Sequence, residues 1–334
     1  MNKMHMGITM LGASGTGKTC YLYAMADAMQ IGSCNFTFTA TPYRKSLELQ
    51  QSWDSIITGR WPRGTDESTE YEFMCSYAMR PLATFTWYDY RGGVLSNPDD
   101  EAEQNALFRK MNDSRCLIMC ISAEVIRGVL NGDHRVRSVF RIYMNLLQNY
   151  RANTGKTVPI VFAITKADLL GKGQFDDGVE QIRKNYLAAL FAEDPAGGWF
   201  ISFVPVSLGM NLSSGTNNEI HGTIAPANVH IPVLIAIKCA IAELLAIKNA
   251  ELSGLKNDLA AQRDSLWKNQ QRSGWDKFWN GDPSDVISDT ISCLTSSHES
   301  LEKEISGLAN DLNELQKEIN RCQMVVYSNG KKLR

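Results

Sequence analysis

One short stretch of this chain constrains its fold more than any other. Residues 12–19 read GASGTGKT, which places three glycines ahead of a lysine and a threonine. An apolar run at residues 6–11 precedes the stretch, and residues 20–29 continue it without a helix breaker. A strand, a glycine-rich turn and a helix in this order are typical of a loop that binds phosphate with its backbone N–H groups. The stretch therefore predicts that the chain binds a nucleoside triphosphate.

The chemistry of this loop gives its residues separate roles. The backbone N–H groups of residues 14–18 would point into one concavity at a helix N-terminus, where partial positive charge favours phosphate. Lys18 would reach the β- and γ-phosphates, and the Thr19 hydroxyl would bind Mg²⁺. A glycine-rich turn with a chance Lys-Thr pair is the alternative, and the flanking strand and helix disfavour it. The predicted phosphate-binding residues are Gly12, Ser14, Gly15, Thr16, Gly17, Lys18, Thr19 and Cys20.

Two more motifs follow strand-like runs. Residues 83–88 predict a strand, and residues 89–92 read DYRG, which has the form Asp-x-x-Gly. Residues 160–164 predict a buried strand, and residues 165–168 read TKAD, which has the form Thr-Lys-x-Asp. Asp89 alone could merely cap a turn. The three motifs together make that reading weak.

In this order the three motifs resemble those of the Ras-like, translation-factor-related P-loop GTPases, over about residues 1–230. The resemblance implies GTP or GDP as ligand, with Mg²⁺. It implies that Asp168 selects guanine by accepting from the N1 and N2 hydrogens, a donor pair that adenine does not offer. Lys166 would lie along the base, and Thr165 would tie this segment to the phosphate-binding loop. Ser207, after the predicted strand at residues 200–206, loosely matches the family's loop that recognises guanine O6.

The same resemblance assigns the metal and the switch segments. Asp89 would hold Mg²⁺, usually through a water, and the Gly92 N–H would sense the γ-phosphate. The first switch needs a threonine that meets Mg²⁺ and the γ-phosphate. Thr65 is the choice, because it shortly precedes the predicted strand at residues 71–77 and follows a glycine. The alternatives within residues 31–70 are Thr39, Thr41 and Thr69.

One position departs from the family pattern. Directly after Gly92, where the family has a glutamine that orients the attacking water, this chain has Gly93. Hydrolysis is therefore expected to be slow, or the missing group comes from Arg91, from the first switch or from a partner's arginine. Lys18, Thr65 and Arg91 are the candidate catalytic residues. For Arg91, a surface ion pair is the favoured alternative.

Composition limits the class of protein. The chain has 334 residues, of which 44% are hydrophobic, and this size suits one α/β domain with an appendage. Its net charge of −2 gives no support for nucleic-acid binding. Its eight cysteines include no Cys-x-x-Cys pair, so reduced thiols in a cytoplasmic protein are expected. The sequence shows neither a signal peptide nor a long apolar run, so export and membrane spanning are not expected.

Strands alternate with predicted helices at residues 44–59, 135–150 and 178–192, the first two of them amphipathic. This alternation predicts an α/β protein of P-loop GTPase fold, with a mainly parallel sheet and helices on both faces. Residues 209–230, rich in Gly, Asn and Ser, predict a surface loop.

The C-terminal third has a different pattern. Apolar residues recur at spacings of three and four from residue 241 and again over residues 301–322, which predicts two heptad helices. We expect a domain at residues 231–334 built as an antiparallel coiled-coil hairpin, beside a GTPase domain at residues 1–230. The connection carries Trp275, Phe278 and Trp279. Such a tip would enter a membrane, as in dynamin-like GTPases, or bind a protein, and its aspartates favour the protein.

These features predict a GTP-binding switch that acts through its switch segments and its helical hairpin on a protein effector, an activating partner or a second copy of itself. A weaker resemblance is to bacterial GTPases of conflict and defence systems. A dynamin-like membrane GTPase, a nucleotide-binding scaffold without turnover and an ATPase are the alternatives.

Overall fold

The computed structural model describes residues 4–33, 35–62, 68–91, 93–94, 101–195, 197–272 and 283–334. The chain forms two compact units. The first comprises Met1–Ile237 together with Glu318–Arg334, and the second comprises Lys238–Lys317. This division differs from the expected boundary at residue 230, because both ends of the C-terminal third belong to the first unit.

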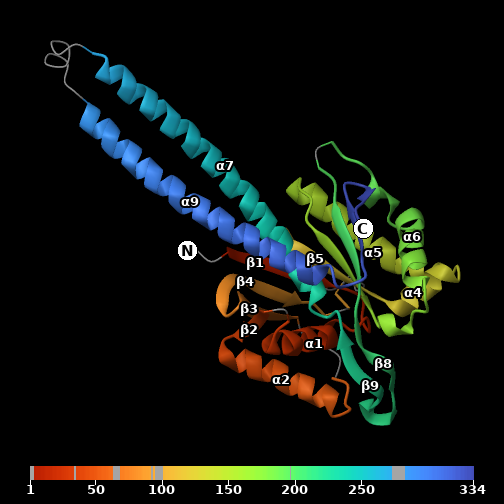
Figure 1. Ribbon diagram of the computed structural model, residues 1–334. Coiled ribbons are helices and arrows are strands. Elements are labelled where there is room, and N and C mark those ends of the chain that lie inside the picture. The colour runs from red at the N-terminus through yellow and green to blue at the C-terminus, as the bar shows by residue number, and fades with distance from the viewer. Residues whose placement is uncertain are drawn as a thin grey trace. The chain divides into compact units, whose positions relative to one another are not determined.

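The first unit is built on one mixed β-sheet (Figure 1). In the described part of the chain the sheet has nine strands in the order β11-β10-β7-β6-β5-β1-β4-β3-β2. The strands are β1 (Met4–Leu11), β2 (Phe36–Thr41), β3 (Thr69–Tyr77), β4 (Arg80–Asp89), β5 (Ser114–Ser122), β6 (Ile160–Thr165), β7 (Phe200–Pro205), β10 (Val325–Ser328) and β11 (Lys331–Lys332).

The centre of this sheet is parallel, as predicted. Strands β4, β1, β5, β6 and β7 pair in parallel, so their carboxyl ends meet at one edge. Every residue of β6 is buried, which is typical of a parallel strand covered on both faces. The strands on either side are antiparallel: β3 and β2 beyond β4, and β10 and β11 beyond β7.

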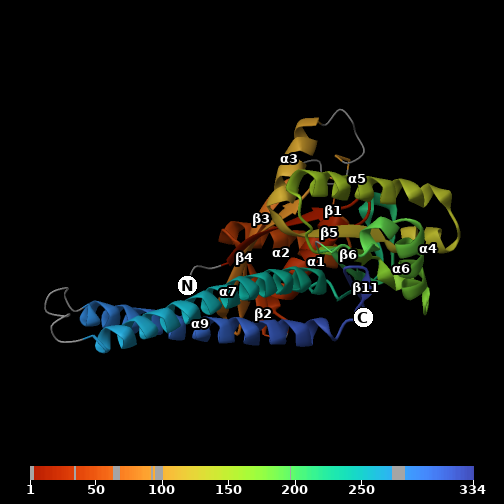
Figure 2. The same cartoon turned by 90° about the horizontal axis from the view of Figure 1, so that it is seen from above.

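Helices cover both faces of the sheet (Figure 2). They are α1 (Lys18–Ile31), α2 (Tyr43–Ile57), α3 (Glu101–Asp113), α4 (Ala123–Leu130), α5 (Arg137–Thr154) and α6 (Gln174–Asn185). Apolar side chains of α3, α4, α5 and α6 form one core with β1, β5, β6 and β7, in which Phe140 and Phe162 are almost fully buried. Helices α1 and α2 pack on each other outside that core. The predicted α/β layering is therefore confirmed.

The segment between α1 and β3 contains a strand that the sequence analysis did not predict. Residues 36–41 form β2, an edge strand antiparallel to β3. Its residues Phe36, Phe38 and Ala40 alternate as buried positions, as the period of a strand requires. The amphipathic helix predicted here is present as α2, which buries Leu49, Trp53 and Ile56.

Residues 209–230 are largely a β-hairpin, so the predicted surface loop is wrong. Strands β8 (Ser207–Ser214) and β9 (Ile220–Ala227) pair in antiparallel fashion. The glycines that suggested a loop allow the two strands to approach. A side chain at Gly209 would collide with the carbonyl of Thr223, and Gly222 has a φ of 110°, which favours glycine.

The C-terminal segment returns to the sheet. Val325 of β10 lies opposite Phe203 of β7, and Tyr327 lies opposite Ile201. The apolar run at residues 325–327 is buried against this edge of the sheet. The expected helical domain at residues 231–334 therefore ends too late, because an apolar β-branched run pairs better with β7 than it continues a coiled coil.

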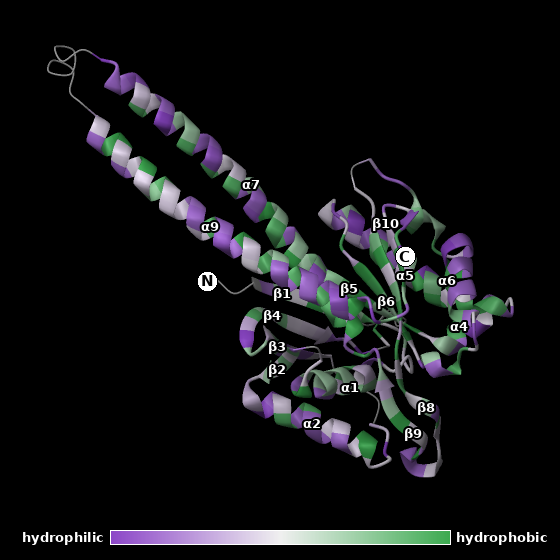
Figure 3. Ribbon diagram, viewed as in Figure 1, coloured by the Kyte–Doolittle hydropathy of each residue, from purple (hydrophilic) through white to green (hydrophobic). Residues whose placement is uncertain are grey.

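The second unit consists of paired helices. It contains most of α7 (Ile231–Gln270) and of α9 (Ser284–Ile319), which run in opposite directions (Figure 3). Leu252 and Leu259 of α7 are buried, and Lys248 forms an ion pair with Glu304 of α9 at 3.0 Å. The predicted antiparallel helical hairpin is therefore present. Trp275, Phe278 and Trp279 of the expected aromatic tip lie outside the described residues.

Among the described helices, none combines the length and the apolar character that crossing a membrane requires.

Candidate functional site

The predicted phosphate-binding loop connects β1 to α1. Gly15 and Gly17 have φ angles of 76° and 83°, a region that side chains disfavour, and Gly17 is the N-cap of α1. Gly12 is required for a different reason: a Cβ there would lie 2.8 Å from Thr16 Oγ1 and 3.0 Å from Cys120 Cβ. The strand, turn and helix follow the order that the sequence predicted, and the open N-terminus of α1 suits an anion.

Lys18 is buried at the first turn of α1, with 7% of its surface exposed. Its Nζ donates to the carbonyl oxygens of Gly12 at 2.8 Å and Ala13 at 3.1 Å. Burial lowers the pKa of Lys18, an effect that Cys120 and Asp89 oppose. A buried ammonium beside neutral carbonyls gains free energy when an anion arrives, so Lys18 is suited to bind phosphate.

Thr19 and Asp89 meet at the carboxyl ends of β1 and β4. The parallel register places Met10 beside Asp89, and the Thr19 hydroxyl donates to Asp89 Oδ2 at 3.2 Å. Asp89 is 2% exposed, and its buried Oδ1 has no hydrogen-bond partner among the described residues. Burial raises the pKa of Asp89 to about 6, against the opposing effects of Lys18 and Thr19.

This pair fits a magnesium ion. A hydroxyl and a carboxylate are the hard oxygen ligands that Mg²⁺ prefers, and the unpartnered Asp89 Oδ1 is free to accept from metal-bound water. In the part of the chain that the structure describes, no three His, Cys, Asp or Glu side chains gather as a metal site. The ion would therefore be held by Thr19 and Asp89 together with phosphate oxygens and water, as is usual for Mg²⁺ beside a nucleotide.

The Thr-Lys-x-Asp motif follows β6 and contacts the phosphate-binding loop. Thr165 is buried, and its hydroxyl donates to the Thr16 carbonyl at 2.7 Å, so the predicted tie between the two segments is present. Lys166 has a φ of 56°, and its Nζ pairs with Glu124 at 2.8 Å. Asp168 Oδ1 accepts from the Ser207 hydroxyl at 2.7 Å. Strands β6 and β7 are neighbours, so the residues after their carboxyl ends lie together.

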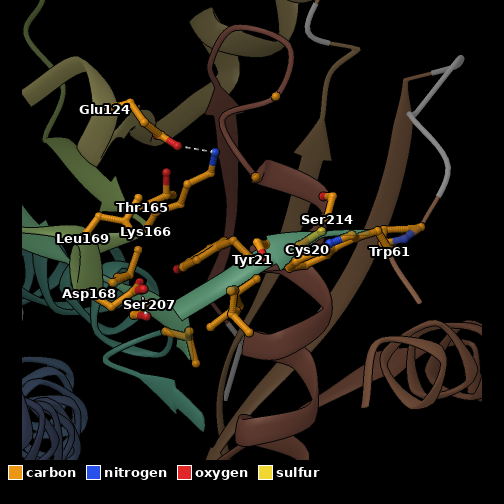
Figure 4. Close-up of a pocket in the computed structure, with 18 residues that line it drawn as sticks. Cys20, Tyr21, Trp61, Glu124, Thr165, Lys166, Asp168, Leu169, Ser207 and Ser214 are labelled. Atoms are coloured by element: carbon orange, nitrogen blue, oxygen red, sulfur yellow. Dashed lines mark hydrogen bonds and ion pairs between the residues drawn. The ribbon is translucent and has the colours of Figure 1, made fainter. Parts of the chain in front are cut away.

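One cavity of about 330 Å³ joins these motifs (Figure 4). Gly15, Gly17 and Cys20 line it from the phosphate-binding loop and α1, while Lys166, Asp168 and Ser207 line it from the segments after β6 and β7. A concave site that combines a phosphate-binding loop with convergent polar groups at the carboxyl edge of a parallel sheet has the form of a nucleotide pocket.

Some cavity residues were not predicted from the sequence. Glu124, which holds Lys166, follows the carboxyl end of β5, and that position after a parallel strand was the signal available. Trp61 and the β8 residues Leu212, Ser213 and Ser214 also line the cavity. No motif marks these residues, because three of them belong to the β8–β9 hairpin and Trp61 is hydrogen-bonded to its tip.

Two predicted residues, Thr65 and Gly92, lie outside the described residues. Of the alternatives to Thr65, Thr39 and Thr41 lie in the edge strand β2, and Thr41 Oγ1 is 3.5 Å from Glu72. Thr69 begins β3 and lies opposite Asp89. Of these three threonines, Thr69 is the one that pairs across the sheet with Asp89, the expected metal ligand.

Arg91 and Gly93 follow β4. Arg91 Nη2 donates to Glu103 Oε2 at 2.9 Å, which is the surface ion pair considered as the alternative to catalysis. Among the described residues, a Cβ at Gly93 would meet Arg91 Nη1 alone, at 3.7 Å. Gly93 itself provides no side chain to orient water.

Comparison with known proteins adds little to this site. No protein-family model and no curated protein matches the chain. Among solved structures, the SRb-GTP/SRX signal recognition particle receptor complex from Chaetomium thermophilum contains a chain with 16% identity and a TM-score of 0.37, covering 64% of this chain and 94% of that one. Sup35 complexed with GDP shows 12% identity and a TM-score of 0.28, over 62% of this chain and 38% of that one. These values are too low to carry function to this chain.

Proposed function

We propose that this chain is a GTP-binding molecular switch with slow intrinsic GTP hydrolysis. The observation that carries the proposal is a cavity lined both by Gly15 and Gly17 of the phosphate-binding loop and by the hydrogen-bonded pair of Asp168 and Ser207. A nucleotide bound there would have its phosphates at the N-terminus of α1 and its base beside Asp168.

The base preference rests on the acceptor at Asp168. A carboxylate accepts two hydrogen bonds from the N1 and N2 hydrogens of guanine, whereas adenine leaves it without a donor. The Ser207 hydroxyl holds one carboxylate oxygen at 2.7 Å and so fixes the direction of the other. Asp168 is exposed, so a base that covered it without donating to it would remove its water without replacement, and this arrangement favours GTP and GDP over ATP.

Slow turnover follows from what surrounds the γ-phosphate position. Lys18 would bind the phosphates, and Mg²⁺ held by Thr19 and Asp89 would neutralise charge there when bound. Gly93 offers no side chain to orient water, and Arg91 is engaged with Glu103. We therefore assign hydrolysis to a complex in which a partner supplies the group that orients water, or in which Arg91 leaves Glu103. We assign Thr65 as the threonine of the first switch.

The signal would pass to a protein effector or activating partner, with the helical hairpin as the contact arm, in the cytoplasm. A second copy of the chain could take the partner's place. Membrane contact through the hairpin connection and a scaffold role without turnover are the competing functions, and each predicts a different experimental result.

Binding of GTP, GDP and ATP to the purified chain tests the proposal. Calorimetry with and without Mg²⁺ is expected to give guanine-selective, Mg²⁺-strengthened binding, and phosphate release in the same samples is expected to be slow. Guanine binding with no phosphate release, alone or with candidate partners, would indicate the scaffold. Binding to vesicles that exceeds binding to protein would indicate the membrane GTPase, and ATP preference or no nucleotide binding would overturn the proposal.

A further inference from the structure

Trp61 is a cavity residue with an unused donor. Its indole lines the cavity that also contains Cys20 and Asp168. The indole Nε1 is buried and has no hydrogen-bond partner among the described residues. A buried N–H group without an acceptor is costly, and in most folded proteins such a group is paired. The indole therefore borders the cavity with an unused donor, which a small rotation of the side chain would bring to a bound ligand.

The β8–β9 hairpin holds Trp61 in this position. The Trp61 backbone N–H donates to the Asn218 carbonyl at 2.8 Å, and the Ile220 N–H donates to the Gly59 carbonyl at 2.8 Å. Arg60 and Glu219 form an antiparallel bridge between these bonds. The tip of the hairpin is thus paired with residues 59–61, so the backbone of Trp61 is fixed by contacts far away in the sequence.

The other end of the same hairpin begins at the base-binding residues. β8 starts at Ser207, which donates to Asp168, and it runs along the cavity wall. The cavity residues on it are Ser207, Leu208, Leu212, Ser213 and Ser214. Both ends of β8 therefore line the same cavity, one beside Asp168 and the other in the part that Trp61 also lines.

The geometry of the cavity indicates which part of a nucleotide Trp61 would meet. In Figure 4, Asp168 and Ser207 lie at one end, Trp61 and Ser214 at the other, and Tyr21 between them. A base held at Asp168 would direct the sugar and phosphates of the nucleotide toward the part of the cavity that Cys20 and Trp61 line. The acceptors nearest the indole would then be oxygens of the sugar or of the α-phosphate.

We propose that Trp61 is a nucleotide-binding residue whose Nε1–H donates to a sugar or α-phosphate oxygen, and that the β8–β9 hairpin is the cavity wall that positions it. This inference rests on the proposed nucleotide-binding function. It adds a ligand contact that none of the three sequence motifs contains, made by Trp61 and held in place by a hairpin that begins at Ser207.

The test compares Trp61→Phe, which removes the donor but keeps an aromatic ring, with Trp61→Ala, which removes both. Trp199→Phe is the matched control, because Trp199 packs near Tyr150 and does not line the cavity. Calorimetric affinity for GDP is measured, and for 2′-deoxy- and 3′-deoxy-GDP. We expect Trp61→Phe to weaken GDP binding about tenfold, Trp61→Ala more, and Trp199→Phe not at all.

The deoxy nucleotides separate the two acceptors. Suppose that one deoxy-GDP binds wild type more weakly than GDP does, and that this difference disappears in Trp61→Phe; the acceptor is then the missing hydroxyl. If Trp61→Phe instead weakens the binding of both deoxy nucleotides as much as that of GDP, the acceptor is the α-phosphate. Melting without nucleotide checks folding of each variant, and Leu212→Ala offers a second change in the same wall, expected to weaken GDP binding.

Two negative results are distinguishable. Wild-type protein that binds no guanine nucleotide would remove the proposed function itself. Wild-type protein that binds GDP, together with folded Trp61→Phe and Leu212→Ala variants of unchanged affinity, would overturn the role of Trp61 and of the hairpin wall while leaving the proposed function in place.

Discussion

At the scale of single residues, Asp89 shows how the site is maintained at a cost to the fold. Its carboxyl is 2% exposed, and burial raises its pKa to about 6. A carboxyl whose pKa is higher in the folded state than in the unfolded state stabilises the fold only while it is protonated. Its contribution is full below the unfolded pKa of about 4 and is lost as the pH rises through about 6.

Asp89→Asn is therefore expected to stabilise the nucleotide-free protein at pH 7.5, by about 1–3 kcal/mol, since one pKa unit corresponds to about 1.4 kcal/mol. The same variant should lose the Mg²⁺-dependent part of GTP affinity. Denaturant unfolding between pH 5 and 8 measures the first effect, and the gain should shrink toward pH 5. A variant that is less stable than wild type at pH 7.5 would show that the buried, ionised Asp89 does not destabilise the fold.

Ser207→Ala removes the hydroxyl that holds Asp168 Oδ1 at 2.7 Å. One hydrogen bond is worth about 0.5–1.5 kcal/mol, so GDP affinity should fall about two- to tenfold while ATP binding stays as weak as before. Ser207→Thr, which keeps a hydroxyl, is the control and should bind GDP nearly as wild type. Equal GDP affinity of the alanine variant and wild type would show that Ser207 does not position the carboxylate.

The predicted site residues that lie near one another in the structure belong to motifs that directly follow central parallel strands. Lys18 and Thr19 follow the turn after β1, and Thr165 ends β6 and donates to the Thr16 carbonyl. Trp61 and Glu124 were not found, because their contacts in the cavity depend on which distant segments the fold brings beside them. A pattern within one segment does not contain that information.

At the scale of elements, the apolar runs predicted the central strands and α2, because burial on a sheet requires a period that a single segment displays. The strands that were missed have weaker signals. β2 is an edge strand inside a segment interpreted as a switch, and β8 and β9 carry glycines where the two backbones nearly touch. β10 is only four residues long, and its pairing with β7 spans more than a hundred residues of sequence.

The returning strand β10 provides a prediction of stability. Tyr327 is 3% exposed, and its ring packs edge-on against Phe191 at 4.9 Å between centroids. Tyr327→Ala should lower the free energy of unfolding by about 3 kcal/mol, as large-to-small changes of buried aromatics do. Tyr327→Phe keeps the ring and should cost about 1 kcal/mol or less. Urea denaturation measures both, and an alanine variant as stable as wild type would mean that β10 does not hold the sheet edge.

At the scale of the whole molecule, the sequence predicted a nucleotide-binding α/β unit and a helical hairpin but misplaced the boundary between them. The change from strand and helix alternation to heptads marks where the second pattern begins. It does not show which later segment pairs with the edge of the sheet. Glu318–Arg334 belong to the first unit because β10 and β11 extend that sheet. Domain limits depend on such long-range pairing.

Turnover is also a property of the whole molecule and its partners. Arg91 forms a half-buried ion pair with Glu103, and Gly93 has no side chain. We expect Arg91→Ala to leave the single-turnover rate of phosphate release by the isolated chain within about twofold of wild type, since hydrolysis assistance from an arginine is worth about 10³–10⁵ where one acts. A drop of tenfold or more would identify Arg91 as the catalytic group.

The most direct test of guanine recognition at Asp168 is an exchange of base and side chain. Xanthine carries an oxygen where guanine carries its 2-amino group, so the amide of an Asp168→Asn variant can donate to xanthine and not to guanine. If Asp168 recognises guanine, wild type binds GTP and not XTP, and the variant binds XTP and not GTP, with ATP weak in both. A variant that keeps its GTP affinity, or that gains none for XTP while remaining folded, would contradict it.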